Sequence, residues 1–279
     1  MHHPRPRSLR QPRLLLLPLA LAAALPAWAQ QDGNTTPAAT MAVAQAATST
    51  PVDLDAVIVT GEKADRSVQD TATSVAVTTE VRMEQENLTS LYEVFDRTAN
   101  VSKTYGDSGF TLRGMLNNDG EGAPLSTIYL DGAAMSHFMT ATAPTTLWDL
   151  SQVEILRGPQ STIQGENALA GAVVLRTQDP DLDGWHGRAR LQVSDPSDRR
   201  FAFASGGPLV EDELGVRIAV EDRKFDGFID NPTRGEAEDA LESTLMRAKA
   251  LWTPSAIPGL TARLGFTHFD RVGPYAWSY

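Results

Sequence analysis

The chain contains no cysteine among its 279 residues. This absence excludes disulfide bonds, thiolate metal sites and a cysteine nucleophile. Histidine is scarce as well, with five residues scattered along the chain, and no H-E-x-x-H, G-x-S-x-G or G-K-[ST] motif is present. Carboxylates are plentiful, but nothing singles out one pair as the acid and base of a hydrolase. The sequence therefore gives an enzyme no support, and we predict no catalytic residue, no bound metal and no cofactor.

Long apolar runs are also lacking, except for one at the N-terminus. Residues 14–25 are apolar, follow a segment with four arginines, and precede the A-x-A cleavage site Ala27-Trp28-Ala29. The run is too short to span a bilayer as a helix. We therefore interpret residues 1–29 as a cleavable signal peptide of an exported protein. Any membrane-embedded part of the mature chain must then consist of β-strands.

Basic residues are outnumbered, 24 against 35 acidic residues, for a net charge of −11. The signal peptide holds four of the arginines and no acidic residue, so the exported part is more acidic still. Without a basic stripe, we expect no binding to nucleic acid. The solubility of a secreted protein accounts for the acidity equally well.

Two segments follow the signal peptide. Residues 30–54 are rich in Ala, Thr, Gln and Pro without apolar periodicity, which predicts a flexible linker. Residues 55–61 read D-A-V-I-V-T-G. An extended β-branched segment after a flexible linker is able to add to the sheet edge of a partner protein. The pattern alone favours the plainer interpretation, an ordinary first strand.

Residues 65–180 predict one small α+β domain. Alternation over residues 73–78 predicts a strand, and the capping box Ser90-x-x-Glu93 predicts the start of a short helix. Strands ending in turns are expected at residues 110–114 and 127–132. The apolar face of the predicted helix consists of Leu91, Val94, Phe95 and Thr98.

Residues 151–180, SQVEILRGPQSTIQGENALAGAVVLRTQDP, predict two strands folded against each other around a loop of small residues. This stretch resembles the end of the plug domain in TonB-dependent outer-membrane receptors, whose signature is similar to VEVLRGPxGTLYGxxAxGGAxNxxT. The F-T-L-R-G and T-I-Y-L-D-G segments resemble further plug elements, in the family's order. Residues 55–61 then resemble the TonB box, which reverses their interpretation from a first strand to a TonB contact.

From residue 185 onward the sequence alternates between apolar and polar residues with period two. A soluble β-sandwich has the same alternation, but the position after plug motifs favours strands of an outer-membrane barrel, with short turns on the periplasmic side and longer loops outside. The apolar series begin with Trp185, Leu214, Met246 and Leu260. Short turns are expected at residues 207–213 and 253–259, and a longer outer loop at residues 226–240.

The fold class implied by the resemblance is an α+β plug domain followed by the start of an antiparallel transmembrane β-barrel. A plugged transporter barrel has about 22 strands of about 9–11 residues each. Residues 185–279 suffice for roughly five such strands, which cannot close into a barrel. We therefore expect the sequence to be an N-terminal fragment of a receptor.

The resemblance implies uptake of a scarce ligand across the outer membrane of a Gram-negative bacterium. A ferric siderophore is the usual cargo, and TonB with its inner-membrane complex supplies the energy. The predicted TonB contacts are Asp55, Ala56, Val57, Ile58, Val59 and Thr60. Arg113 and Arg157 match plug arginines that pair with carboxylates of the barrel wall in relatives. Ligand contacts are expected at the loop residues Tyr105, Asn117, Asn118 and His137.

Two other classes of protein stay open at this point. One is a soluble periplasmic module that resembles the plug and binds TonB or a ligand without a barrel. The other is a secreted carbohydrate-active enzyme with a β-sandwich fold. Membrane association would distinguish the first from a receptor, and loss of hydrolysis on mutation of a carboxylate pair would identify the second.

Overall fold

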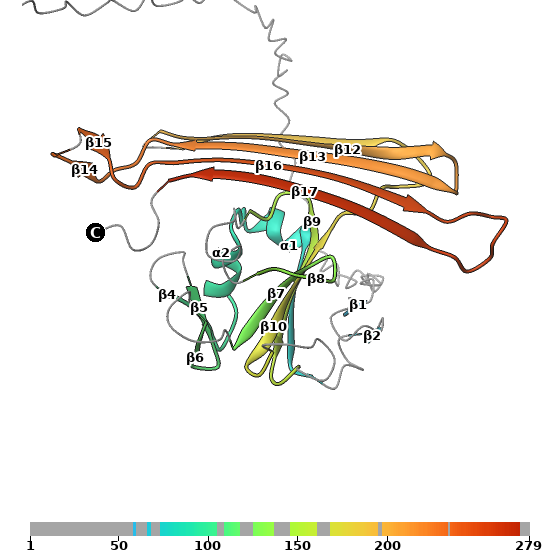
Figure 1. The fold of residues 1–279 in the computed structure, drawn as a ribbon, viewed down its shortest axis with the longest axis horizontal. Coiled ribbons are helices and arrows are strands. Elements are labelled where there is room, and N and C mark those ends of the chain that lie inside the picture. The colour runs from blue at the N-terminus through green and yellow to red at the C-terminus, as the bar shows by residue number, and fades with distance from the viewer. Residues whose placement is uncertain are drawn as a thin grey trace, which may run out of the picture. The chain divides into compact units, whose positions relative to one another are not determined.

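The computed structural model describes residues 58–59, 66–67, 73–104, 109–117, 125–136, 146–160, 168–194, 197–233 and 235–273. Residues 54–279 form one compact unit, which contains a small α+β domain and a long antiparallel sheet (Figure 1). The predicted signal peptide and linker lie outside the described residues. Within the described ranges, no helix is both long and apolar enough to cross a membrane.

The α+β domain is built on a mixed five-stranded sheet with the order β3-β9-β10-β7-β8. Strand β9 (Leu150–Arg157) pairs antiparallel with β10 (Gly171–Thr177), as residues 151–180 predict. On its other side β10 pairs in parallel with β7 (Ser126–Leu130), which continues through a turn into β8 (Ala133–Ala134). Strand β3 (Val75–Thr79) pairs with β9 and forms one edge of the sheet.

Two short helices and a second, three-stranded sheet complete this domain. Helix α1 (Glu80–Gln85) follows β3 directly and was not foreseen from the sequence. Helix α2 (Leu91–Asp96) has the predicted capping box, in which Glu93 accepts from the backbone N–H of Ser90. The small sheet consists of β4 (Val101–Thr104), β5 (Gly109–Leu112) and β6 (Met115–Asn117).

The core lies between α2 and the two sheets. Leu91, Val94 and Phe95 of α2 are buried, as their helical spacing predicts, and the ring of Phe95 lies 4.8 Å from that of Phe110 on β5. Val173 of β10 is fully buried in the same cluster. Burial of several such side chains, each worth about 1.5–3 kcal/mol, holds the helix against the sheets.

The second part of the unit is a five-stranded antiparallel meander. Its order is β11-β12-β13-β16-β17, in agreement with the roughly five barrel strands expected. The strands are β11 (His186–Ser194), β12 (Asp198–Val210), β13 (Leu214–Phe225), β16 (Leu241–Trp252) and β17 (Ala262–Val272).

The connections differ in length at the two ends of the meander. Residues 211–213 and 253–261 form short turns at one end. The predicted turn at residues 207–213 is therefore too long, because β12 continues to Val210, with a shift of register between Pro208 and Val210. At the other end, residues 226–240 contain the two-stranded β14 (Asp230–Asn231) and β15 (Glu236–Ala237).

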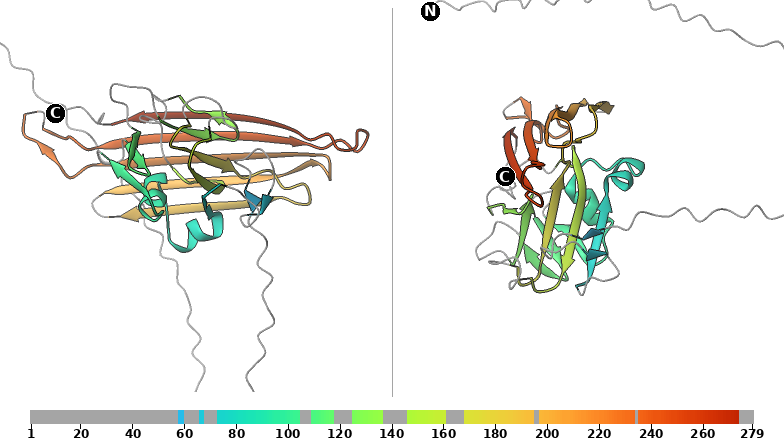
Figure 2. Two further views of the ribbon diagram at one scale, coloured as in Figure 1. Left: turned by 90° about the horizontal axis from the view of Figure 1, so that it is seen from below. Right: turned by 90° about the vertical axis from the view of Figure 1, so that its right-hand side faces the viewer.

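The two faces of the meander have opposite character. Large apolar side chains such as Leu191, Phe201 and Leu264 are 77%, 51% and 75% exposed, whereas Ala202 and Ala204 on the other face of β12 are buried beneath the α+β domain. A soluble sandwich would bury its apolar face, but here the apolar face is the exposed one, as on the lipid side of an outer-membrane barrel. This arrangement does not match a β-sandwich fold. Figure 2 shows the α+β domain on one side of the sheet only.

Two residues of the predicted TonB box are described. Strand β1 (Ile58–Val59) pairs antiparallel with β2 (Arg66–Ser67). Val59 is fully buried, Ile58 is 48% exposed, and the side chain of Gln152 on β9 donates to the Ile58 carbonyl at 3.1 Å.

Candidate functional site: the interface between the α+β domain and the long sheet

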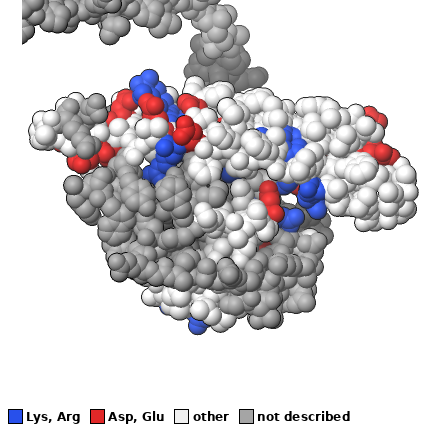
Figure 3. All heavy atoms as spheres, in the orientation of Figure 1, with Lys and Arg blue, Asp and Glu red and all other residues white. Residues whose placement is uncertain are grey.

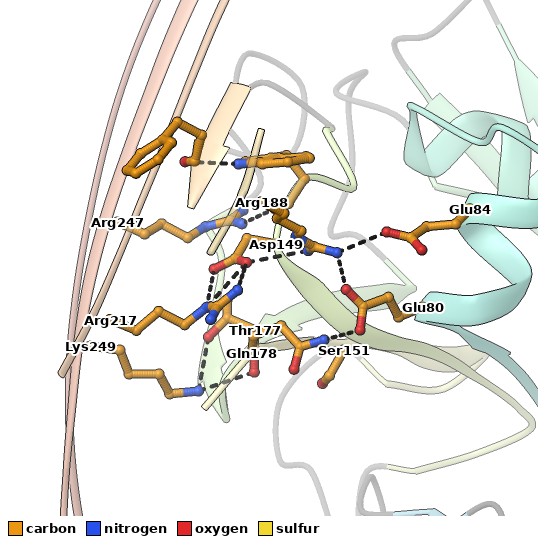
Figure 4. A network of polar contacts seen from close by, with 12 residues as sticks. Glu80, Glu84, Asp149, Ser151, Thr177, Gln178, Arg188, Arg217, Arg247 and Lys249 are labelled. Carbon is orange, nitrogen blue, oxygen red and sulfur yellow. Dashed lines mark hydrogen bonds and ion pairs between the residues drawn. The ribbon is translucent and has the colours of Figure 1, made fainter. Parts of the chain in front are cut away.

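Residues 146–149, which immediately precede β9, connect the α+β domain to the long sheet and are called the anchor segment here. The four residues read Thr-Leu-Trp-Asp and are all buried. Three of them contact strands β12, β13 and β16 through side chains or backbone. Figure 4 shows the contacts of Asp149 with Arg188 and Arg217, and that of Lys249 with Thr177.

Asp149 is the centre of the network. Its backbone adopts a left-handed conformation with φ of 59°, which aspartate tolerates better than most residues. Arg217 of β13 binds the carboxylate with both ends of its guanidinium, at 2.9 Å from Nε to Oδ2 and 2.6 Å from Nη2 to Oδ1. Arg188 of β11 adds a third donor at 3.2 Å. This bidentate geometry is the strongest form of the arginine–carboxylate pair.

Trp148 contacts strands β11, β12 and β16 beside this pair. Its indole Nε1 donates to the carbonyl of Phe203 in the middle of β12 at 3.2 Å, and its own carbonyl accepts from Arg247 of β16 at 2.6 Å. The guanidinium groups of Arg188 and Arg190 lie 4.7 and 5.3 Å from the indole centroid. Such cation–π contacts contribute about 0.5–2 kcal/mol each.

Thr146 adds a contact at the other end of the anchor segment. Its hydroxyl donates to Glu221 of β13 at 2.9 Å, and its backbone forms an isolated bridge with Ser90 at the start of α2. Glu221 is only 5% exposed. A buried carboxylate requires donors of this kind, because an isolated buried charge is costly.

Arg188 also links the long sheet to helix α1. Its guanidinium contacts Glu80 and lies 3.0 Å from Glu84. Burial raises the pKa of the Glu80 carboxyl above its usual range, although the charge of Arg188 opposes this shift. Arg188 therefore joins three carboxylates of the α+β domain, Glu80, Glu84 and Asp149.

A second cluster surrounds Lys249 of β16. Its ammonium Nζ lies 2.9 Å from the hydroxyl of Thr177, at the end of β10, and 2.7 Å from Asp179. Burial by itself would raise the pKa of Asp179, but the hydrogen bond and charge of Lys249, with Arg263, outweigh it and hold that pKa below its usual range. Thr177 also donates to Asp131 at 2.6 Å, which fixes the turn after β7 against β10.

The interface attaches the α+β domain to the long sheet, and its described residues form no catalytic arrangement. Arg188, Arg217 and Lys249 lie in ion pairs with carboxylates of the α+β domain. The described part of the chain holds no group of three or more His, Asp or Glu suited to a metal ion. Removal of one partner from such a buried pair costs about 3–5 kcal/mol. These contacts hold the α+β domain against the long sheet.

The two predicted interface arginines lie elsewhere, close to each other. Arg157 donates to the carbonyl of Ala99 at 3.2 Å, and the backbone N–H of Arg113 donates to the neighbouring Asn100 at 2.8 Å. Arg113 has a left-handed φ of 55° and is exposed. Neither forms an ion pair with a residue that the structure describes, so their pairing with wall carboxylates stays a prediction.

Most of the other predicted site residues fall outside the described part of the chain. This holds for Asp55, Ala56, Val57 and Thr60 of the TonB box, and for the loop residues Tyr105, Asn118 and His137. Asn117 ends β6 opposite Phe110, and its side chain is not described. The proposed ligand contacts therefore stay predictions.

The sequence reasoning missed the anchor segment entirely. A signal for it was present, because the polar positions of the alternating strands are strongly basic in an acidic chain. Such a face, turned away from lipid, requires buried acidic partners. The basic residues on that face are Arg188, Arg190, Arg217, Arg247 and Lys249.

Comparison with known proteins now decides the family. The model of the TonB-dependent receptor plug domain matches residues 67–172, which include β3 to the start of β10. Residues 67–172 are a plug domain of the TonB-dependent receptor family. We therefore call the α+β domain the plug and the long sheet the wall.

Named relatives and solved structures agree with this assignment. The plug and wall resemble the ferrioxamine B receptor of Salmonella typhimurium, 30% identical over 56% of this chain and 23% of the relative. The pesticin receptor of Yersinia pestis is 32% identical over 46% of this chain and 18% of its own length. The chain thus spans about a fifth of these relatives.

The fold matches a crystal structure of the ferric yersiniabactin uptake receptor FyuA from Yersinia pestis with a TM-score of 0.63 and 23% identity, over 74% of this chain and 32% of that chain. The plug-domain match, the named relatives and the exposed apolar face of the wall place the chain in the outer membrane of a Gram-negative bacterium. A soluble periplasmic module does not fit this location. The family is one of transport receptors.

Proposed function

We propose that this chain is the plug and first wall strands of a transporter that takes up a ferric siderophore, with energy delivered by TonB. The observation that carries the proposal is the anchor segment, which fixes a plug to the polar face of a lipid-exposed wall. Two of the similar proteins are named for iron-bearing ligands, ferrioxamine B and ferric yersiniabactin. A ferric siderophore is the ligand class that these names share.

The proposed TonB contact is the segment around β1. Ile58 and Val59 are already in extended conformation and paired with β2, so the same backbone is suited to strand addition by TonB once it leaves the plug. Gln152 and the burial of Val59 hold the segment in place. Release of β1 therefore has to break its pairing with β2 and one side-chain hydrogen bond, and to expose one apolar side chain.

Growth and uptake of radioactive iron under iron limitation test this function. The complete gene is expressed in a strain without siderophore receptors of its own, and a panel of ferric siderophores is supplied. We expect one member of the panel to restore uptake, only in cells with functional TonB. Uptake that is equal without TonB, or that never occurs with any ferric siderophore, would reject the proposal.

A proline at position 59 supplies a matched test of the TonB contact. Proline has no backbone N–H and cannot complete a strand ladder, so Val59→Pro should abolish uptake while ligand binding to purified protein is retained. Val81, an exposed apolar residue on α1, supplies the control substitution Val81→Thr, which should leave uptake intact.

A further inference from the structure

A polar pocket of about 320 Å³ lies where the start of α2 faces the wall. It is separate from the network around Asp149, although Thr146 and Glu221 line it on one side. On the plug side its lining includes Thr89, Ser90 and Glu93. Among the side-chain hydrogen bonds of the anchor segment given above, only that between Thr146 and Glu221 joins residues that line this pocket.

The wall side of the pocket is a row of cross-strand neighbours. Gln192 pairs with Arg200, Arg200 with Arg223, Arg223 with Ser243, and Ser243 with Arg271. All five residues line the pocket. Arg200 and Arg223 are direct neighbours of like charge, an arrangement that destabilises a sheet unless negative charge lies close to it.

The carboxylates of the pocket are already engaged. Asp198 accepts both Nε and Nη2 of Arg223, at 3.0 and 2.8 Å. Glu93 accepts from the backbone N–H of Ser90 at 3.1 Å, and Glu221 accepts from the Thr146 hydroxyl at 2.9 Å.

Arg200 is the cation that forms no direct ion pair with these carboxylates, although their charges act on it from a distance, that of Glu221 most strongly. It is 6% exposed and forms no ion pair with any carboxylate in the described ranges. Its guanidinium donates one long hydrogen bond of 3.4 Å, from Nη1 to the carbonyl of Thr89, and its Nε is buried without a partner among the described residues. The side-chain oxygen of Gln192, its cross-strand neighbour, is also buried without a partner in those residues.

The pocket lies toward the end of the wall that carries the longer connection. Ser194 and Asp198 flank the β11–β12 connection, Leu241 begins β16 after residues 226–240, and Arg271 is near the end of β17. Longer loops of outer-membrane barrels face the outside. Figure 3 shows charged side chains of both signs gathered at this end of the sheet. A ligand arriving from outside would therefore meet the pocket before the anchor segment.

We propose that this pocket binds an oxyanion group, with Arg200 as the principal donor and Arg223 beside it. The planar guanidinium presents parallel N–H donors that match a carboxylate or phosphate. The free oxygen of Gln192 would accept from a hydroxyl next to the anionic group, so a hydroxycarboxylate suits both unmatched groups. This proposal rests on the proposed function in one respect: the oxyanion group would naturally come from the carboxylate of an iron chelate.

Calorimetric titration of the protein expressed from its complete gene, purified in detergent, tests the pocket directly. The probes are sodium citrate, ferric citrate and inorganic phosphate, each at low salt. We expect citrate to bind, and Arg200→Gln to weaken that binding by about tenfold or more. Arg199→Gln is the matched control, because Arg199 is the preceding residue of β12, is exposed, and lies 3.5 Å from Asp226 on the surface.

The probes also distinguish the sources of the oxyanion. Tighter binding of ferric citrate than of citrate identifies an iron chelate, whereas equal binding of phosphate identifies a site for free oxyanions. Arg200→Lys keeps the charge and should keep part of the affinity, and the β-sheet circular dichroism of each variant verifies folding. Absence of binding for all three probes, or equal affinity in Arg200→Gln and wild type, would overturn the site.

The two proposals fail separately in these experiments. Oxyanion binding that persists while no ferric siderophore restores growth would reject the transport function alone. Uptake that depends on TonB, with a pocket that binds no oxyanion, would reject the site alone.

Discussion

Replacement of Asp149 should loosen the plug from the wall more than any other single carboxylate change in the described chain. Asp149 is 3% exposed and accepts two donors from Arg217, whose side chain is 11% exposed. Asp149→Ala leaves this guanidinium buried and unpaired. Arg188 is affected less, because Glu80 and Glu84 remain as its partners.

The expected magnitude follows from the burial of the pair. Removal of one partner of a buried ion pair costs about 3–5 kcal/mol, which corresponds to a roughly hundredfold to few-thousandfold larger population of detached plug. Asp149→Asn keeps the shape and one acceptor, so its effect should be smaller than that of alanine. Both changes act on attachment, so the fold of the plug itself should persist.

Hydrogen exchange of the Trp148 indole N–H, which donates to the Phe203 carbonyl of the wall, measures this population in the protein made from its complete gene. Asp183→Asn is the control, since Asp183 is exposed and outside the network. The double variant Asp149→Asn with Arg217→Gln should lose less than the sum of the two single changes, because the partners act on each other. Exchange rates of Asp149→Ala equal to those of Asp183→Asn, or strictly additive effects, would refute the reasoning.

Three further changes test other parts of the structure. Gly171→Ala should destabilise the plug by at least about 2 kcal/mol in urea unfolding, because a Cβ at this φ of 151° would lie 2.1 Å from the carbonyl oxygen of Leu156. Asp179 has a lowered pKa in the folded state. The stability that its pair with Lys249 contributes is therefore present above the unfolded-state pKa of about 4, and it is lost as the pH falls through the folded-state pKa. Asp179→Asn should therefore reduce the loss of folding stability that we expect below about pH 4. Ile218→Arg, on the lipid face of the central strand, should cost about 2–4 kcal/mol of stability in lipid vesicles.

Each of these changes has a control in the same chain. Gly184→Ala meets only an ordinary contact of 3.5 Å with His186 and should be neutral. Asp183→Asn should leave the loss of folding stability at acid pH as large as in wild type. Ile257 is 53% exposed like Ile218 but lies in a turn, so Ile257→Arg should cost little. An effect in any control equal to that in its test variant would contradict the explanation given.

Local sequence patterns determined several elements of the fold. The capping box at Ser90 and Glu93 predicts α2, because both partners lie within one helical turn. Period-two alternation predicts the wall strands and their two faces, since successive side chains of a strand point in opposite directions. The hairpin of β9 and β10 was also predictable, because its strands are separated by a loop of small residues only.

Helix α1 escaped prediction for a local reason. It has only six residues, of which Met83 alone is buried, so it shows almost no apolar periodicity. Its position is decided by contacts to distant residues, such as those of Glu80 and Glu84 with Arg188. Tertiary contacts of this kind override weak local preferences.

The sequence by itself determined that the wall strands carry a basic face and an apolar face, whereas only the tertiary structure decided which acidic residues meet the basic ones. Asp149 is 68 residues from Arg217, and Trp148 is 99 residues from Arg247. No periodicity links positions so far apart. Their pairing depends on strand register and on how the plug docks, and both result from the packing of the whole unit.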